Sequence, residues 1–196
     1  RVHRRDYVTA LLDAVPEKGR IQLDPDTAMS PESGDAALRA SGAIVAAIDA
    51  VMAGEANSAF CAVRPPGHHA EPGRGMGFCL FNNVAIGAQH ARHAHGIERV
   101  AIVDFDVHHG NGTQAAFWDD PTVMFASSHE YPLYPGTGAE DETGAGNIFN
   151  VPLAGMSGSV EFRKGMERTV LPALEAFKPG LVIVSAGFDA HARDPL

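Results

Sequence analysis

The chain has 196 residues, 45% of them hydrophobic and 20% charged, and a formal net charge of −9 at pH 7. This composition is typical of one globular domain with a sizeable core, and the negative charge argues against a basic nucleic-acid-binding surface while it suits a cationic substrate. No apolar run approaches the roughly 18 residues of a membrane span, and no signal-peptide pattern opens the sequence.

The pattern of apolar residues predicts strands that alternate with helices. Four short apolar runs have the continuous character of buried parallel strands, and a fifth is marked more weakly. In chain order the sequence predicts a helical stretch at Tyr7–Leu12, a helix at Gly34–Met52, a strand at Ser58–Val63, a helix at Asn82–His95, strands at Arg99–Phe105, Thr122–Ser127 and, more weakly, Asn147–Leu153, a helix at Ser157–Phe177 and a strand at Gly180–Ser185. This alternation is typical of a doubly wound parallel α/β sheet.

Histidine and aspartate residues gather where four of the predicted strands end. Arg64–His69 follows the first strand, Asp104–Asn111 closes the second, Ser127–His129 closes the third and Gly187–Asp189 closes the last. Ligands of open parallel sheets bind at the carboxyl ends of the strands. We therefore expect these four segments to meet in one functional site.

The spacing Asp104-x-Asp106-x-His108 indicates a metal site. Residues two apart on a strand share a face, so these three side chains can converge at the strand end. Two carboxylates and an imidazole suit zinc or iron(II), and Asp189 from another strand end supplies a further ligand. Three protein ligands leave a position open for water, as in catalytic sites. The alternative is that these aspartates only cap the following helix.

The adjacent pair His68-His69 supplies the chemistry that such a site needs next. A bound metal lowers the pKa of its water, and a neighbouring histidine can take the proton and return it to a leaving amine. Buried imidazoles need partners, so core filling is a poor explanation, and an exposed loop pair is the alternative. We expect His109 to be a supporting residue, because on a strand it faces away from His108.

Two aromatic residues, Phe78 and Tyr134, lie on predicted loops near the same edge of the sheet. Their rings would wall a narrow slot for an aliphatic chain, with core packing as the alternative.

The other histidines point less clearly to a function. His90, His93 and His95 are interpreted as a solvated helix face, although His90 and His93 have a spacing that could chelate a metal. His3 and His191 are interpreted as surface or loop residues.

Taken together, these motifs resemble the histone deacetylase superfamily, which includes acetylpolyamine amidohydrolases and acetoin-utilisation proteins, and within it the bacterial, class II-like members. The resemblance runs from about Leu23 to Leu196. Its motifs are Arg64-Pro-Pro-Gly-His-His-Ala70, Gly77-Phe-Cys-Leu-Phe-Asn-Asn83, Asp104 to Gln114, Tyr134-Pro-Gly-Thr-Gly138 and Ala186-Gly-Phe-Asp-Ala190. Their combination is highly specific.

The resemblance implies a fold, an activity and a set of residue roles. The fold is the arginase–deacetylase fold, a three-layer α/β/α sandwich with a mainly parallel sheet. The activity is zinc-dependent hydrolysis of N-acetyl amides by metal-activated water, with one zinc per chain, iron(II) as the alternative metal, and a structural potassium ion. The implied roles are zinc ligands for Asp106, His108 and Asp189, the general base for His69 with Asn111 as its partner, the second histidine for His68 paired with Asp104, substrate contacts for Gly77, Phe78 and Tyr134, and potassium binding for Asp104, Asp106, His108, Ser127 and Ser128.

The sequence also departs from the family pattern by an absence. Family members polarise the amide carbonyl with a tyrosine from a Gly-Gly-Tyr loop beyond the last zinc-ligand strand, whereas this sequence ends seven residues after Asp189. We therefore expect residues 1–196 to be a single deacetylase domain that is incomplete at both ends and nearly inactive. An open sheet edge beyond Leu181–Ser185 predicts self-association, so a homo-oligomer is an expected state.

Two other functions stay open at this point. An arginase or agmatinase relative carries Asp-x-His-x-Asp for a second manganese, whereas Gly110 stands at that position here and cannot bind a metal. A non-catalytic, metal-binding remnant is the other alternative.

The expected substrate is an acetylated lysine peptide or an acetylpolyamine, with no nucleic acid and no membrane as partner. The two cysteines, Cys61 and Cys79, form no metal-type pair, so we expect a reduced, cytoplasmic protein.

Overall fold

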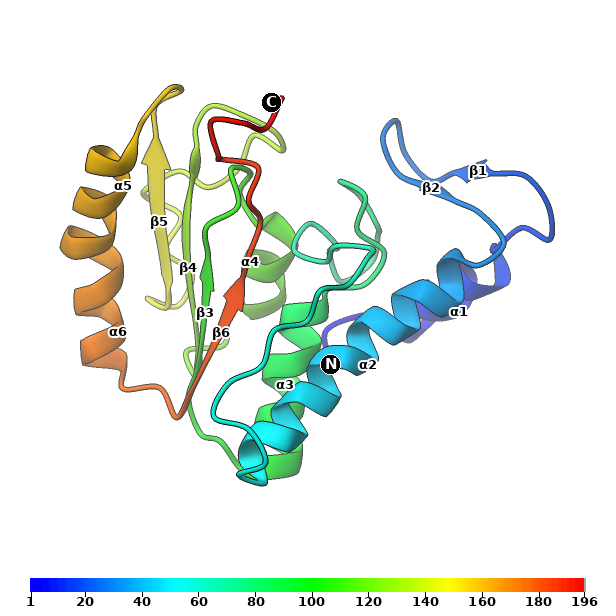
Figure 1. Ribbon diagram of the computed structural model, residues 1–196, viewed down its shortest axis with the longest axis horizontal. Coiled ribbons are helices and arrows are strands. Elements are labelled where there is room, and N and C mark those ends of the chain that lie inside the picture. Colours follow the sequence, from blue (N-terminus) through cyan, green and yellow to red (C-terminus); the bar gives the residue numbers. More distant parts are fainter. Residues whose placement is uncertain (196) are drawn as a thin grey trace. The chain divides into compact units, whose positions relative to one another are not determined.

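A computed structural model describes residues 1–195 of the chain. These residues divide into two compact units, one from Arg1 to Gly96 and the other from Ile97 onward. Figure 1 follows both units along the sequence by colour. Within residues 1–195, no helix combines the length and the apolar character needed to cross a bilayer.

The second unit contains a four-stranded, fully parallel sheet in the order β5-β4-β3-β6. Asp104, the last residue of β3, pairs with Ser127 of β4 on one side and with Ser185 of β6 on the other. Four predicted strands are thus confirmed, and β4 runs three residues past the predicted end at Ser127. The strand bounds are β3 Val100–Asp104, β4 Val123–Glu130, β5 Ile148–Leu153 and β6 Leu181–Ser185.

Helices cover both faces of this sheet. Alternate strand residues such as Ala101, Val103 and Ala126 form a buried cluster with Val170 from the helical run behind β5. Figure 1 shows that run on one side of the sheet and α4 on the opposite side. Three layers follow from this arrangement, in agreement with the predicted α/β/α sandwich. The helices are α4 Asn111–Phe117 on one side and α5 Ser159–Gly165, η1 Met166–Val170 and α6 Leu171–Phe177 on the other.

The helix predicted at Ser157–Phe177 is interrupted by a π-helical segment, η1. Pro172 stands in the first turn of α6 and has no N–H to donate to the carbonyl of Arg168. A wider turn ahead of the proline accommodates the missing hydrogen bond.

The first unit is mainly helical. α2 and α3 pack against each other, and a Cβ atom on Gly87 would come within 2.9 Å of the Ile44 side chain, so the glycine allows Ile44 to pack closely against α3. Asn82 caps α3, since its side-chain oxygen accepts a hydrogen bond from Ala85 N at 3.1 Å. The elements are α1 Arg5–Asp13, β1 Ile21–Gln22, β2 Ala28–Met29, α2 Ser33–Met52 and α3 Asn83–His95.

One expectation for this unit is wrong, and another holds only in part. Ser58–Val63 forms no strand, and the Phe60 side chain is 75% exposed. A short apolar run becomes a strand only beside another strand, and the first unit, as described, offers only the two-residue strands β1 and β2. His3 lies in the loop before α1, as one of its two interpretations had it, but it is not a surface residue. It is buried, with Nδ1 3.0 Å from Glu71 O and Nε2 accepting from Asn82 N at 2.9 Å, and burial lowers its pKa.

Candidate functional site

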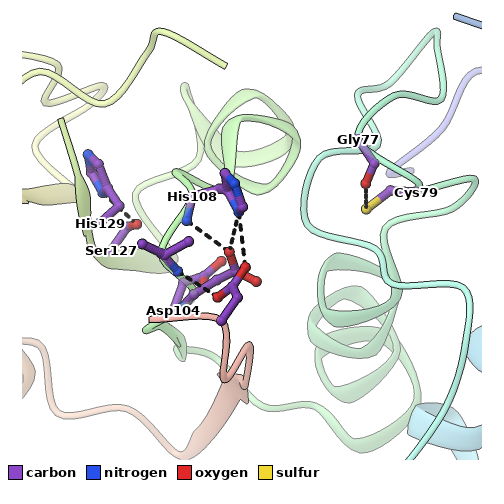
Figure 2. A network of polar contacts seen from close by, with 9 residues as sticks. Gly77, Cys79, Asp104, His108, Ser127 and His129 are labelled. Carbon is purple, nitrogen blue, oxygen red and sulfur yellow. Dashed lines mark hydrogen bonds and ion pairs between the residues drawn. The ribbon is translucent and has the colours of Figure 1, made fainter. Parts of the chain in front are cut away.

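The three predicted zinc ligands lie together in the second unit. His108 Nδ1 is 3.0 Å from Asp106 Oδ1 and 3.0 Å from Asp189 Oδ2. One potential ligand atom from each residue lies within 4.8 Å of the others. Figure 2 shows His108 above the carboxylates, with the dashed contacts converging on them. This arrangement presents two oxygens and one nitrogen to a single point, the donor set of a divalent transition-metal site.

The local backbone differs from the one that the spacing predicted. β3 ends at Asp104, so Asp106 and His108 lie on the following loop and are not presented by strand alternation. Asp104 Oδ1 accepts from Asp106 N at 3.1 Å, and Asp106 Oδ1 accepts from His108 N at 2.8 Å. The motif therefore forms two successive turns in which a carboxylate accepts from the amide two residues ahead. Asp189 Oδ1 fixes the loop from the other side by accepting from Val107 N at 2.9 Å.

Gly187 belongs to the motif Ala186-Gly-Phe-Asp-Ala190, and the sequence alone predicted no role for it. A Cβ atom at this position would overlap the Asp106 carboxylate. The chain leaving β6 thus passes close to the loop that leaves β3, and this close passage brings Asp189 to the other two ligands. A glycine two residues before a candidate ligand was the available signal.

Charge favours a cation at this site. Hydrogen bonds that His108 donates to the carboxylates, first that of Asp106 and then that of Asp189, outweigh the opposing effect of burial and raise the pKa of His108 to about 9. Burial acts to raise the pKa of Asp189, but the hydrogen bonds from His108 and from Val107 N outweigh it and hold that pKa below the ordinary value of 3.8. Two carboxylates around one imidazole form a negative, partly buried cluster, which fits a divalent ion.

The histidine pair lies in the first unit. His68 and His69 are 6% and 4% exposed and their ring centroids are 4.0 Å apart, so the alternative of an exposed loop pair is wrong. Gly77 packs against His69 so closely that a Cβ atom there would overlap the ring. The pairing of His68 with Asp104, and of His69 with Asn111, stays a prediction.

Residues from the β1–β2 turn hold the loop that carries Gly77 and Phe78. Gly77 N donates to Asp26 Oδ1 at 3.2 Å, and Phe78 N donates to Thr27 Oγ1 at 3.0 Å. Phe78 has a left-handed backbone with φ 64° and a side chain that is 60% exposed. Its ring is therefore not core filling. Asp26 and Thr27 gave no signal in the sequence, because they lie about fifty positions from the loop that they anchor.

A buried polar network supports the other aromatic residue. His109 Nδ1 is 2.8 Å from Thr137 Oγ1 and its Nε2 is 3.0 Å from Gln114 Oε1. Burial, with the neighbouring His129, lowers the pKa of His109 to about 4. A neutral His109 thus anchors the loop that follows Tyr134. This residue lies on no strand, so the reason given for its supporting role does not hold, and the role itself stays a prediction.

The same loop is fixed at Gly138. Glu142 accepts hydrogen bonds from the amides of Gly138 and Ala139, and His129 Nε2 is 2.9 Å from Gly138 O. The Tyr134 ring stands edge-on to His108 with a centroid distance of 6.1 Å, and Tyr134 is 36% exposed. An exposed ring beside a candidate ligand suits a substrate contact better than core packing.

The remaining predicted residues are buried around the end of β3. Ser127 and Ser128 lie inside β4, and Ser127 Oγ is 2.9 Å from His129 Nδ1 (Figure 2). Asp104, opposite Ser127, is 1% exposed. Asn111 is the first residue of α4 and is also buried. A buried carboxylate needs a compensating positive charge or several donors, which is compatible with the predicted potassium ion.

Comparison with known proteins identifies the family. The family model of the histone deacetylase domain matches residues 1–196. The chain is 44% identical to Histone deacetylase 14, chloroplastic, of Arabidopsis thaliana over 210 residues, which are 100% of this chain and 49% of that protein. It is 44% identical over 201 residues to the Histone deacetylase-like amidohydrolase of Pseudomonas aeruginosa, covering 100% of this chain and 53% of the relative.

A solved structure agrees with this result. The crystal structure of the HDA15 HD domain superposes with a TM-score of 0.93 at 40% identity, covering 99% of this chain and 58% of that one. The chain spans about half the length of the first curated relatives that it matches. With its parallel sheet, flanking helices and family match along the whole sequence, the chain belongs to the histone deacetylase domain family and has its α/β fold.

Proposed function

We propose that the protein containing this chain hydrolyses N-acetyl amides, with zinc held by Asp106, His108 and Asp189. Membership of the histone deacetylase domain family supports deacetylase-type hydrolysis. The observation that carries the proposal is the convergence of two carboxylates and one imidazole within 4.8 Å of one another at the ends of β3 and β6. Zinc in such a site acts as a Lewis acid and lowers the pKa of a water ligand to about 7.

The chain's own residues then handle protons and orient the substrate. His69 takes the proton of the attacking water and later returns it to the departing amine, and His68 beside it, with its ring 4.0 Å away, completes the pair. Asn111 is the proposed partner of His69, and Asp104 that of His68. Close packing of Gly77 against the His69 ring supports a fixed orientation for the base.

The substrate class follows from the aromatic residues and the charge. Phe78 and Tyr134 are partly exposed rings, suited to contact with the aliphatic chain of an acetylated lysine or an acetylpolyamine. The net charge of −9 favours amine-bearing substrates over nucleic acid. We further propose that Asp104, Asp106, His108, Ser127 and Ser128 hold a structural potassium ion. Iron(II) is the alternative to zinc. Two further predictions stay open: that residues 1–196 act as one domain, and that the protein is cytoplasmic.

The test uses the full-length protein that contains this chain. It is assayed on an acetyl-lysine peptide and on an acetylpolyamine, beside arginine and agmatine as ureohydrolase substrates. We expect amine and acetate to be released from at least one acetylated substrate, and no urea to form. Metal binding without turnover of either acetylated compound would favour the non-catalytic remnant, and urea release would favour the arginase relatives.

A further inference from the structure

We propose that Asp49, His90 and His95 form a second transition-metal site, separate from the family site and lying entirely within the first unit. Asp49 is in the last turn of α2, and His90 and His95 are in the second half of α3. The Nε2 atoms of both histidines lie 2.6 Å from the same atom, Asp49 Oδ1. Among residues 1–195, this is one of two groups whose potential ligand atoms lie within 4.8 Å of one another.

The geometry corrects the pairing that the sequence suggested. His93 does not face His90: its Nδ1 is 2.7 Å from the carbonyl oxygen of Gln89, one turn back on the same helix. The ring that approaches His90 is that of His95, with a centroid distance of 5.5 Å and nearly perpendicular planes. Two imidazoles thus present the same nitrogen to one carboxylate oxygen from a different helix.

The donor set selects the metal class. Two imidazole nitrogens and one carboxylate oxygen suit zinc and its neighbours in the first transition series, whereas magnesium and calcium require a shell made of oxygen ligands. Ligand atoms of a tetrahedral zinc ion lie roughly 3.4 Å apart, since each is about 2.0–2.2 Å from the metal. The two 2.6 Å contacts therefore have to open by less than one ångström, and water fills the fourth position.

The surroundings allow that adjustment and favour a cation. The side chains of His90 and His95 are 24% exposed and that of Asp49 is 50% exposed, so all three are open to solvent and none is enclosed in the core. The C-terminal ends of α2 and α3 lie side by side here (Figure 1), and helix C-termini carry partial negative charge. A metal at this point would tie the two longest helices of the first unit together.

The competing explanation is that His90 and His95 only form surface ion pairs with Asp49, and this explanation predicts that no metal binds. Zinc binding is measured on the full-length protein, purified without a histidine tag, by equilibrium dialysis and elemental analysis. The variants are His90→Gln/His95→Gln and, as a matched control on the same helix, His93→Gln. We expect the wild type and His93→Gln to bind one more zinc per chain than the double variant. Because the readout is a difference, it does not depend on occupancy of the family site or on activity.

A second variant and a second measurement guard against misfolding. Asp49→Asn keeps the size of the side chain and its capacity for hydrogen bonds, and it should lose the same zinc equivalent while its circular dichroism stays unchanged. Excess zinc should raise the midpoint of thermal unfolding further in His93→Gln than in the double variant. Equal zinc content in the wild type and the double variant would overturn the site, and so would a loss in His93→Gln as large as in the double variant.

Discussion

The two groups of potential metal ligands contrast in how the chain builds them. Asp106 and His108 lie on a loop whose backbone amides are bonded to the ligand carboxylates themselves. Asp49, His90 and His95 project from two regular helices, and the contacts among them join side chain to side chain. The first, loop-built group is partly buried and held by backbone hydrogen bonds, whereas the second, helix-built group is more exposed, above all at Asp49, and is held by side-chain contacts. The first group is therefore a preorganised site suited to catalysis, whereas the second is suited to a structural metal that links two helices.

The largest expected effect is the loss of the loop-built site. In the His90→Gln/His95→Gln background, His108→Ala should lower zinc from one per chain to none and reduce turnover of the full-length protein below detection, because one of three ligands is gone. Elemental analysis and an acetyl-lysine assay measure the two quantities. Zinc that survives His108→Ala in this background would mean that the ligands are misassigned.

His69→Ala should separate chemistry from metal binding. Removing a general base costs about 10²–10⁴-fold in rate, whereas zinc content should not change, because His69 is not a proposed ligand. His93→Ala, on a solvent-facing histidine of α3, is the control and should retain full activity. Near-normal turnover in His69→Ala would remove its assignment as the base.

Gly187→Ala tests whether the loop-built group depends on close backbone passage. The added methyl would overlap the Asp106 carboxylate and displace it. Mutations that disturb the orientation of a metal ligand typically weaken metal affinity by about 10–100-fold. Zinc competition with a chelator measures the change. Gly42→Ala in α2 is the control, because a Cβ atom there meets nothing within 4 Å. Wild-type zinc affinity in Gly187→Ala would show that the loop adjusts freely.

The smallest expected effect on activity belongs to the helix-built group. Asp49→Asn should leave turnover of the acetylated substrate unchanged, while the zinc content falls by one per chain. A steady-state assay at fixed zinc concentration measures the first quantity. A large fall in turnover would instead link the helix pair to catalysis and weaken the contrast between the two groups.

Much of the second unit could be predicted from the sequence. β3 and its neighbours are continuous apolar runs, and Asp106, His108 and Asp189 come directly after such runs, where parallel strands end together. The turns that carry the ligands were missed, because strand alternation explained the same two-residue spacing. The competing signal was the tendency of aspartate to accept from the amide two residues ahead.

The errors in the first unit concern contacts that no local pattern encodes. Asp49 precedes His90 by 41 positions, and its charge is typical of any solvated helix face, so only the packing of α2 against α3 brings the two together. His3 is buried because Glu71 and Asn82 satisfy both of its ring nitrogens. Ser58–Val63 has the composition of a strand but lacks a neighbouring strand of matching length in its unit.

The two successive aspartate turns after β3 imply an order of events. Since Asp104 and Asp106 accept amides of their own loop, we expect folding of the polypeptide to order the ligand carboxylate without the help of an ion. The entropy lost in arranging the ligands then belongs to folding and not to capture of the metal. The conformation of such a loop does not depend on the bound ion. A chelator should therefore remove the ion without unfolding the loop, and the site should bind metal again when metal is added back.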